Sequence, residues 1–255
     1  MYLRIDEHEK DSYAVIEDNG VRYTYGEMLE FGNYFKKLIP ERTLIFILCR
    51  NTFATIAAHV ACIDNKIVPL MISEKMDEKL KQGLIDRYQP KYIWMPQENE
   101  SQYDIVSERN GYKLICTGYD TYPVNEELAM LLTTSGSTGS PKLVRHKYSN
   151  LDSNAKNVAA FFGFTKKDKA LISLQLHYTM GLNVACSNLY AGATLMMTTY
   201  NILEKGYWDF FDYSGITNIC GVPHSYEMLK RMKFFKKNHP SLKIIAEGGG
   251  KLTDE

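Results

Sequence analysis

A run of small, hydroxyl-rich residues set between two apolar stretches restricts the fold of this 255-residue chain more than any other feature. Residues Thr134–Lys142 read TSGSTGSPK, and the apolar stretch Leu128–Thr133 leads directly into them. Glycine permits backbone turns with positive φ, which point successive N–H groups inward, and the hydroxyls add donors suited to phosphate oxygens. Lys142 adds a positive charge, and Pro141 stiffens the exit of the loop. The segment predicts a phosphate-binding loop between neighbouring strands at Leu128–Thr133 and Lys142–Arg145.

The residues predicted to bind phosphate are Thr134, Ser135, Gly136, Ser137, Thr138, Gly139 and Lys142. They do not form the P-loop of kinases and GTPases, which requires Gly, four residues, and then Gly-Lys-Ser/Thr. Counted from Gly136, the second glycine position holds Pro141 and the Ser/Thr position holds Leu143. The stretch after Lys142 is also β-prone, whereas a P-loop runs into a helix. A plain Ser/Gly hairpin without a ligand is the alternative interpretation.

The charge balance disfavours nucleic acid and membrane as partners. Lys plus Arg and Asp plus Glu both total 30, so the chain carries no net charge at pH 7. The basic run Lys230–Lys237 is interpreted as a solvated helix end. Met1–Ser12 is charged and no apolar core follows it, and no apolar run reaches the roughly 18–20 residues of a membrane helix. Free thiols in the reducing cytoplasm explain the five scattered cysteines: Cys49, Cys62, Cys116, Cys186 and Cys220.

Short apolar runs alternate with longer amphipathic segments along the chain. The expected strands are Thr43–Cys49, Ile67–Met71, Tyr92–Met95, Lys113–Cys116, Ala170–Leu174, Thr194–Thr198, Asn218–Cys220 and Lys243–Ala246. The expected helices are Thr52–Asn65, Asp77–Arg87, a segment near Asn183–Tyr190, and Ser225–Lys233. Strongly apolar strands separated by helices are typical of parallel sheets covered on both faces. The pattern predicts an α/β fold with two sheet layers.

The segment Thr134–Lys142 closely resembles the phosphate-binding signature of the AMP-forming adenylate ligase superfamily. This superfamily includes acyl-CoA synthetases, peptide-synthetase adenylation domains and luciferases. Further stretches resemble family motifs in the family's order: Tyr23–Met28, Ala61–Leu70, Leu176–Leu182, Gly221–Leu229 and Lys243–Glu255. The resemblance spans nearly the whole chain, and only the loop motif is highly specific alone. One departure is Leu143, which stands where the family usually has glycine after the motif lysine.

The resemblance implies an activity, its cofactors and its partners. Such enzymes use ATP with Mg²⁺ to convert a small carboxylic acid into an acyl-adenylate. The acyl group then passes to a thiol, either CoA or a phosphopantetheine carrier. His177 is the catalytic candidate, placed by the resemblance beside the carboxylate, and a purely structural histidine is the alternative. Gly249, Gly250 and Lys251 are expected to form one wall for adenine or the acyl group, with a plain glycine turn as the alternative.

Residues 1–255 are interpreted as the N-terminal part of an AMP-binding domain, so the fold is expected to be that of an adenylate-forming enzyme, incomplete at its C-terminus. The chain stops before the family's magnesium-binding glutamate, its ribose-binding aspartate, and the lid domain with its catalytic lysine. No metal ligand is therefore assigned within the chain, and these residues alone are expected to be inactive. The alternative is a non-catalytic nucleotide-binding or interaction module that keeps the phosphate loop. The sequence leaves open which acid is activated.

Overall fold

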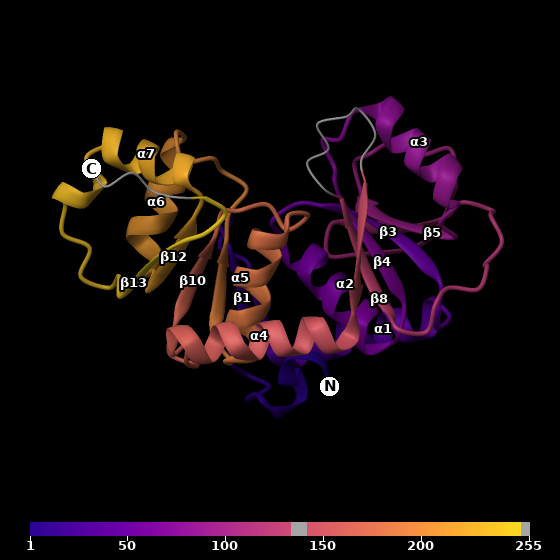
Figure 1. Ribbon diagram of the computed structural model, residues 1–255, viewed down its shortest axis with the longest axis horizontal. Helices are drawn as coiled ribbons and strands as arrows, with labels where there is room; N and C mark the ends of the chain where they lie inside the picture. The colour runs from indigo at the N-terminus through magenta and orange to yellow at the C-terminus, as the bar shows by residue number, and fades with distance from the viewer. Residues whose placement is uncertain (134–141, 251–255) are drawn as a thin grey trace.

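Two sheets, each with parallel strands at its centre, form the framework of the protein (Figure 1). The structure is a computed structural model that describes residues 1–133 and 142–250. Its two-sheet α/β architecture confirms the predicted fold class. Within the described part of the chain, no helix is long and apolar enough to cross a membrane.

The larger sheet has seven strands in the order β6-β7-β5-β3-β4-β8-β9. These are β3 (Leu44–Cys49), β4 (Val68–Ser73), β5 (Tyr92–Pro96), β6 (Asp104–Arg109), β7 (Tyr112–Cys116), β8 (Leu128–Thr133) and β9 (Leu143–Lys147). Strand β3 runs parallel to β4 and β5, and β4 runs parallel to β8. Strands β8 and β9 are antiparallel neighbours, which confirms the prediction that adjacent strands flank the phosphate-loop segment.

The smaller sheet has six strands in the order β13-β12-β10-β11-β1-β2. These are β1 (Tyr13–Glu17), β2 (Arg22–Thr24), β10 (Lys169–Ile172), β11 (Thr194–Met197), β12 (Asn218–Gly221) and β13 (Ile244–Glu247). Every neighbouring pair is parallel except β1 and β2.

The expectation of parallel sheets was therefore wrong at the sheet edges. Strands β6 and β7 form an antiparallel hairpin, and β7 continues antiparallel to β5. The connection between β6 and β7 is Asn110-Gly111, and both residues have positive φ, at 52° and 74°. Two such residues form the turn whose twist matches paired antiparallel strands, so this short connection dictates the hairpin.

Helices cover both faces of each sheet, which explains the nearly continuous apolar runs of the central strands. The helices are α1 (Tyr25–Leu38), α2 (Phe53–Asp64), α3 (Glu78–Tyr88), α4 (Tyr148–Phe162), α5 (Thr179–Tyr190), α6 (Lys205–Ser214), α7 (Pro223–Arg231) and the 3₁₀ turns η1 (Tyr2–Glu7) and η2 (Phe234–Lys236). Figure 1 shows α2 and α5 between the two sheets, α3 outside the larger sheet, and α6 and α7 outside the smaller one.

Alternation along strand β3 shows how one strand serves two cores. Ile45 and Ile47 belong to the central cluster between the sheets, which includes α2 and α5. Phe46 and Leu48 belong to an outer cluster that also holds Leu84 of α3. Successive side chains of a strand point to opposite faces, so a strand with helices on both sides must be apolar at every position.

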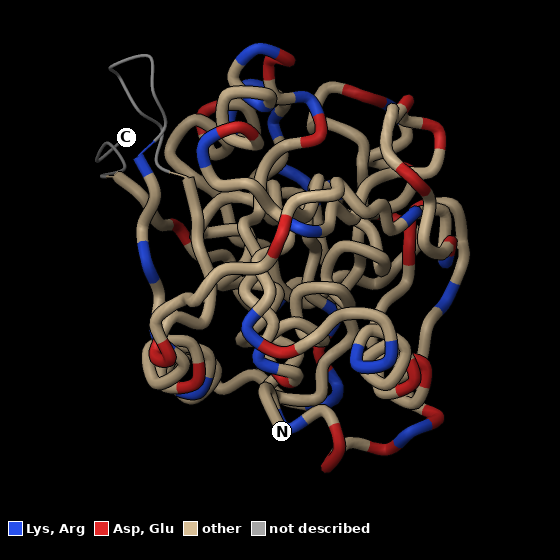
Figure 2. Tube along the Cα trace, turned by 90° about the vertical axis from the view of Figure 1, so that its right-hand side faces the viewer, with Lys and Arg blue, Asp and Glu red and all other residues tan. Residues whose placement is uncertain are grey.

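Most charged residues lie at the surface, although Lys113 and Asp168 are buried. In the view of Figure 2, Lys and Arg are interspersed with Asp and Glu, and neither sign dominates that face. The basic run Lys230–Lys237 spans the end of α7 and the turn η2, with Phe234 buried and the lysines exposed. The five cysteines are all free thiols.

Buried His59 makes stability dependent on pH. This α2 residue is fully buried, and burial lowers the pKa of its imidazole to about 3. Below pH 6.5 the unfolded chain binds a proton there that the folded protein excludes, so stability falls as the pH falls. Relative to His59→Gln, the native protein should lose about 2 kcal/mol of unfolding free energy between pH 7.5 and pH 5.

Urea unfolding of the two proteins at several pH values measures this difference. The comparison is necessary because burial raises the pKa of the nearby Asp64 carboxyl to about 6. That group titrates in the same range with the opposite sign, and its contribution cancels between the two proteins. Parallel pH curves for the native protein and the variant would contradict the prediction.

Candidate active site

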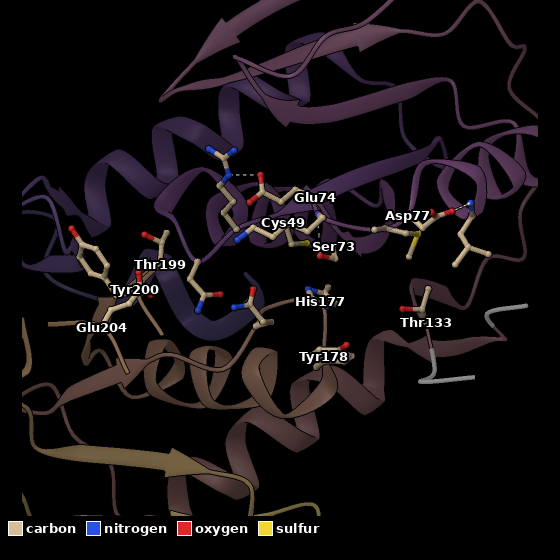
Figure 3. A pocket seen from close by; sticks show the side chains of 16 residues that line it. Cys49, Ser73, Glu74, Asp77, Thr133, His177, Tyr178, Thr199, Tyr200 and Glu204 are labelled. Carbon is tan, nitrogen blue, oxygen red and sulfur yellow. Dashed lines mark hydrogen bonds and ion pairs between the residues drawn. The ribbon is translucent and has the colours of Figure 1, made fainter. Parts of the chain in front are cut away.

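A cavity of about 940 Å³ lies where strands of both sheets end (Figure 3). Its lining comes from the segments after β3, β4, β8, β10 and β11. These residues are Cys49, Arg50, Asn51, Ser73, Glu74, Lys75, Met76, Asp77, Leu80, Thr133, Gln175, His177, Tyr178, Thr199, Tyr200 and Glu204. The carboxyl ends of parallel strands are the usual place for ligand sites in α/β proteins. The topology of both sheets therefore directs the loops of the chain toward one cavity.

Thr133 brings the start of the predicted phosphate loop to this cavity. It is the last residue of β8, it lines the cavity, and it pairs in register with Leu143 at the start of β9. Lys142 directly precedes Leu143 and is exposed, and it is not among the residues that line the cavity. The predicted phosphate ligands between these two ends lie outside the described residues: Thr134, Ser135, Gly136, Ser137, Thr138 and Gly139.

His177 lines the same cavity, from the loop between β10 and α5. The residue is 6% exposed, and Nδ1 has no hydrogen-bond partner among the described residues. Burial lowers the pKa of the imidazole to about 4, so the ring is neutral at pH 7. Its ring centroid lies 4.2 Å from that of Tyr178. A neutral, buried ring with an unused nitrogen can offer a ligand one hydrogen bond, as donor or acceptor.

Asn51 fastens the loop that carries His177 to the opposite sheet. It follows β3 and is 3% exposed. Its Nδ2 donates to the carbonyl oxygens of Ile172 and Leu174, each at 3.2 Å, and its Oδ1 accepts from the N–H of Leu176 at 3.3 Å. One side chain thus satisfies three backbone groups of the other sheet and fixes the segment that leads into His177.

An ion pair between Arg50 and Glu74 also lines the cavity. The Arg50 guanidinium contacts the carboxylates of Glu74 and Glu98, and the side chain of Glu74 is only 11% exposed. Sequence reasoning did not select Arg50, Asn51 or Glu74. The available signal was their position, because each lies directly after an apolar strand, at the edge where α/β ligand sites form.

The role predicted for Gly249 and Gly250, a wall for adenine or the acyl group, stays a prediction. Gly249 and Gly250 follow β13, and a Cβ added at Gly250 would press on the ring of Pro223 at the start of α7. Neither glycine is among the residues lining the 940 Å³ cavity. Lys251 lies outside the described residues. In residues 1–133 and 142–250 no three His, Cys, Asp or Glu side chains gather as metal ligands.

Gly181 allows the first turn of α5 to pack against the loop that holds His177. A Cβ at this position would lie within 3 Å of the backbone oxygens of Leu174 and Gln175. Backbone atoms cannot swing aside, so Gly181→Ala is expected to destabilise the protein by about 1–3 kcal/mol, as overpacking typically does. Gly83→Ala is the matched control, because Gly83 lies in α3 with open space around it. That control should be neutral or stabilising by about 0.5–1 kcal/mol.

Urea unfolding of the two variants compares these effects directly. Equal stability of Gly181→Ala and Gly83→Ala would show that α5 does not pack as described.

Comparisons with known proteins identify the family. The family model described as AMP-binding enzyme matches residues 4–255. The 2-succinylbenzoate–CoA ligase of Escherichia coli is 23% identical over 217 residues, which cover 85% of this chain and 46% of that protein. The probable CoA ligase CCL8 of Humulus lupulus is 29% identical over 145 residues, covering 52% of this chain and 23% of that protein. The chain thus spans about a quarter to a half of the length of these relatives.

Solved structures share the fold. The o-succinylbenzoate CoA synthetase (MenE) of Bacillus subtilis, in complex with the acyl-adenylate intermediate OSB-AMP, matches with a TM-score of 0.78 at 18% identity, covering 98% of this chain and 68% of that one. VinN in complex with L-aspartate matches with a TM-score of 0.76 at 19% identity, covering 96% and 67%. The family predicted from the loop motif is confirmed: this chain belongs to the AMP-binding enzyme family.

Proposed function

We propose that the protein containing this chain activates a carboxylic acid with ATP and passes the acyl group to a thiol. One observation carries the proposal: Thr133, which leads into the phosphate-loop segment, and buried His177 line a single cavity. A phosphate-binding segment and a carboxylate-binding group on one cavity are what adenylate formation requires. Membership of a family that includes CoA ligases among this chain's relatives supports the same activity.

The reaction proceeds in two transfers. A carboxylate oxygen of the acid attacks the α-phosphorus of ATP, and the bond from that phosphorus to the bridging oxygen breaks, releasing pyrophosphate. The sulfur of a thiol, from CoA or a phosphopantetheine carrier, then attacks the acyl carbon. The bond between the acyl carbon and the former carboxylate oxygen breaks, AMP leaves with that oxygen, and the thiol proton passes to solvent. Neither transfer needs a strong base, because alignment and charge stabilisation supply most of the acceleration.

The chain's own residues hold and orient the substrates. Lys142 and the preceding small residues would bind the outer phosphates of ATP through charge and N–H groups. His177, neutral at pH 7, would donate a hydrogen bond to the attacking carboxylate without carrying charge into the cavity. Mg²⁺ would enter with ATP and reduce the charge on its phosphates.

Acid-dependent exchange of labelled pyrophosphate into ATP tests the proposal. The protein is incubated with ATP, labelled pyrophosphate and a panel of carboxylic acids, and we expect exchange with a restricted set of acids. The five free cysteines fit an enzyme of a reducing compartment, the cytoplasm, so the assay is run with reductant. A protein that binds ATP but exchanges with no acid would instead be the non-catalytic nucleotide-binding module.

A further inference from the structure

A second, smaller cavity begins one helical turn beyond His177. Its volume is about 190 Å³, and it lies between α4, α5 and the strand pair β12–β13. Most of its wall is apolar, from Val158, Phe162, Phe164, Val184, Ile219 and Ala246. At about 30 Å³ for each water-sized group, it holds about six such groups. A cavity of this size suits a short aliphatic chain and excludes a long one.

Met180 lines this cavity and packs against Gly248. Met180 stands three residues after His177 in the first turn of α5, and its Sδ lies 3.9 Å from the Cys220 thiol on β12. A Cβ added at Gly248 would overlap the Met180 methyl group, so the two residues are in direct contact. A larger residue at position 248 would therefore require the Met180 side chain to move.

Glu247 provides an unusual polar group at this apolar site. It lines the cavity at the end of β13, and its Oε1 is buried with no hydrogen-bond partner among the described residues. The other polar side chains there are engaged. Asn183 accepts from Asn154 at 2.6 Å, Ser187 donates to the Val184 carbonyl at 3.2 Å, and Asn218 donates to Asn188 at 3.3 Å.

The negative charge of Glu247 acts on this wall of the cavity. Burial raises the pKa of the Cys220 thiol to about 11, and the nearby Glu247 carboxylate adds to the rise. A buried carboxylate oxygen without a partner is costly, whereas a cation placed beside it recovers the lost interaction. A ligand carrying an ammonium group would supply that cation.

We propose that this cavity receives the side chain of the acid, and that the acid is a short, otherwise apolar amino acid whose ammonium group pairs with Glu247. The proposal rests on the proposed function, because it assigns the carboxylate to the neighbouring cavity with His177. It names a substrate class that the loop motif and His177 leave open.

Matched acids test the proposal by pyrophosphate exchange. Straight-chain acids of three to six carbons are compared with the same acids bearing an amino group at successive carbons, and with a ten-carbon acid. The native protein should prefer an amino-bearing acid and reject the long one. Glu247→Gln should raise the KM for that amino acid at least about thirtyfold, as loss of a buried charge partner does, and leave the KM of the plain acid unchanged.

Two further variants separate pocket effects from general damage. Met180→Ala should open the cavity and admit the ten-carbon acid. Glu227→Gln alters an exposed carboxylate of α7 and should change neither KM nor acid preference. Preference for plain acids, or a Glu247→Gln enzyme with unaltered KM values, would overturn the proposal.

Direct binding distinguishes failure of this proposal from failure of the proposed function. If no acid supports pyrophosphate exchange, the result counts against adenylate formation. Binding of the acids to the pocket is then measured by calorimetry without ATP. In that measurement the native chain should bind the short amino acids more tightly than the plain acids, and Glu247→Gln should abolish the difference. Equal binding of the two sets by the native chain overturns the pocket assignment.

Discussion

Replacing Lys142 with alanine is expected to slow adenylate formation by about 10²–10³-fold, as loss of one preorganised electrostatic contact typically does. The lysine directly precedes β9, whose first residue pairs with Thr133 at the edge of the cavity. As proposed above, its charge would lie near the outer phosphates of ATP and would compensate the negative charge that accumulates on the departing pyrophosphate. Pyrophosphate exchange at saturating ATP measures the loss in rate.

Two further variants show whether the loss of rate in Lys142→Ala comes from the loss of charge at the proposed phosphate site. Lys142→Arg keeps the charge and should retain more activity than the alanine variant. Lys147→Ala removes a lysine at the other end of β9, where it pairs with Glu127 at 2.7 Å on the surface. Surface pairs contribute about 0–1 kcal/mol, so this control should exchange at nearly the native rate. Equal losses in Lys142→Ala and Lys147→Ala would contradict the assignment of Lys142 to the phosphates.

Residues 1–255 by themselves are expected to exchange pyrophosphate at least about a hundredfold more slowly than a longer protein that also carries the family's later segments. The chain covers 46% of the Escherichia coli relative and 23% of the Humulus lupulus relative. We propose, from the family resemblance, that the groups that grip ribose and metal and the lysine that stabilises the α-phosphate belong to segments outside residues 1–255. A site that holds only the outer phosphates aligns ATP poorly for attack.

The comparison uses one assay and two proteins. The chain of 255 residues is measured beside a protein extended past Glu255 by the residues encoded downstream. Both carry the same phosphate loop, so nucleotide binding by the shorter chain shows that it is folded. Turnover by residues 1–255 within tenfold of the extended protein would show that the catalytic groups already lie in this chain.

Much of the fold could be predicted because each central strand carries its own signal. The expected strand Thr43–Cys49 is β3, and the expected helix Thr52–Asn65 is α2, each within two residues. Elements with weaker apolar patterns were missed. Helix α1 begins with a capping box, in which Thr24 Oγ1 accepts from the N–H of Glu27 and the Glu27 carboxylate accepts from the N–H of Thr24. That Thr-x-x-Glu spacing is readable from sequence alone.

The hairpin β6–β7 was missed for a similar reason. Strand β6 is largely exposed, so it lacks the apolar run used to recognise strands. Its turn, Asn110-Gly111, is nevertheless among the strongest local signals for a hairpin. Reading turn chemistry together with apolar periodicity would have identified the antiparallel edge of the larger sheet.

In the candidate site, too, residues within a motif could be predicted from the sequence, whereas residues defined by tertiary contacts were missed. His177 could be selected because a motif carries it, and its location at the cavity agrees with a site role, although its catalytic part stays a prediction. Asn51 and Glu74 were not selected. Their position after apolar strands could be read from the sequence, but their contacts join segments more than 20 residues apart. The Glu247 oxygen, which has no hydrogen-bond partner within residues 1–133 and 142–250, likewise becomes visible only when the surrounding wall is known.

The fate of one oxygen atom tests the central claim most directly. The extended protein is given its preferred acid with ¹⁸O in the carboxylate, together with ATP and a thiol acceptor, and the products are analysed by mass spectrometry. If the carboxylate attacks the α-phosphorus, the bridging oxygen leaves with the nucleotide, and AMP carries one ¹⁸O for each thioester formed. Label in inorganic phosphate, with ADP as the nucleotide product, would mean that the γ-phosphorus is attacked and that this protein does not form an adenylate.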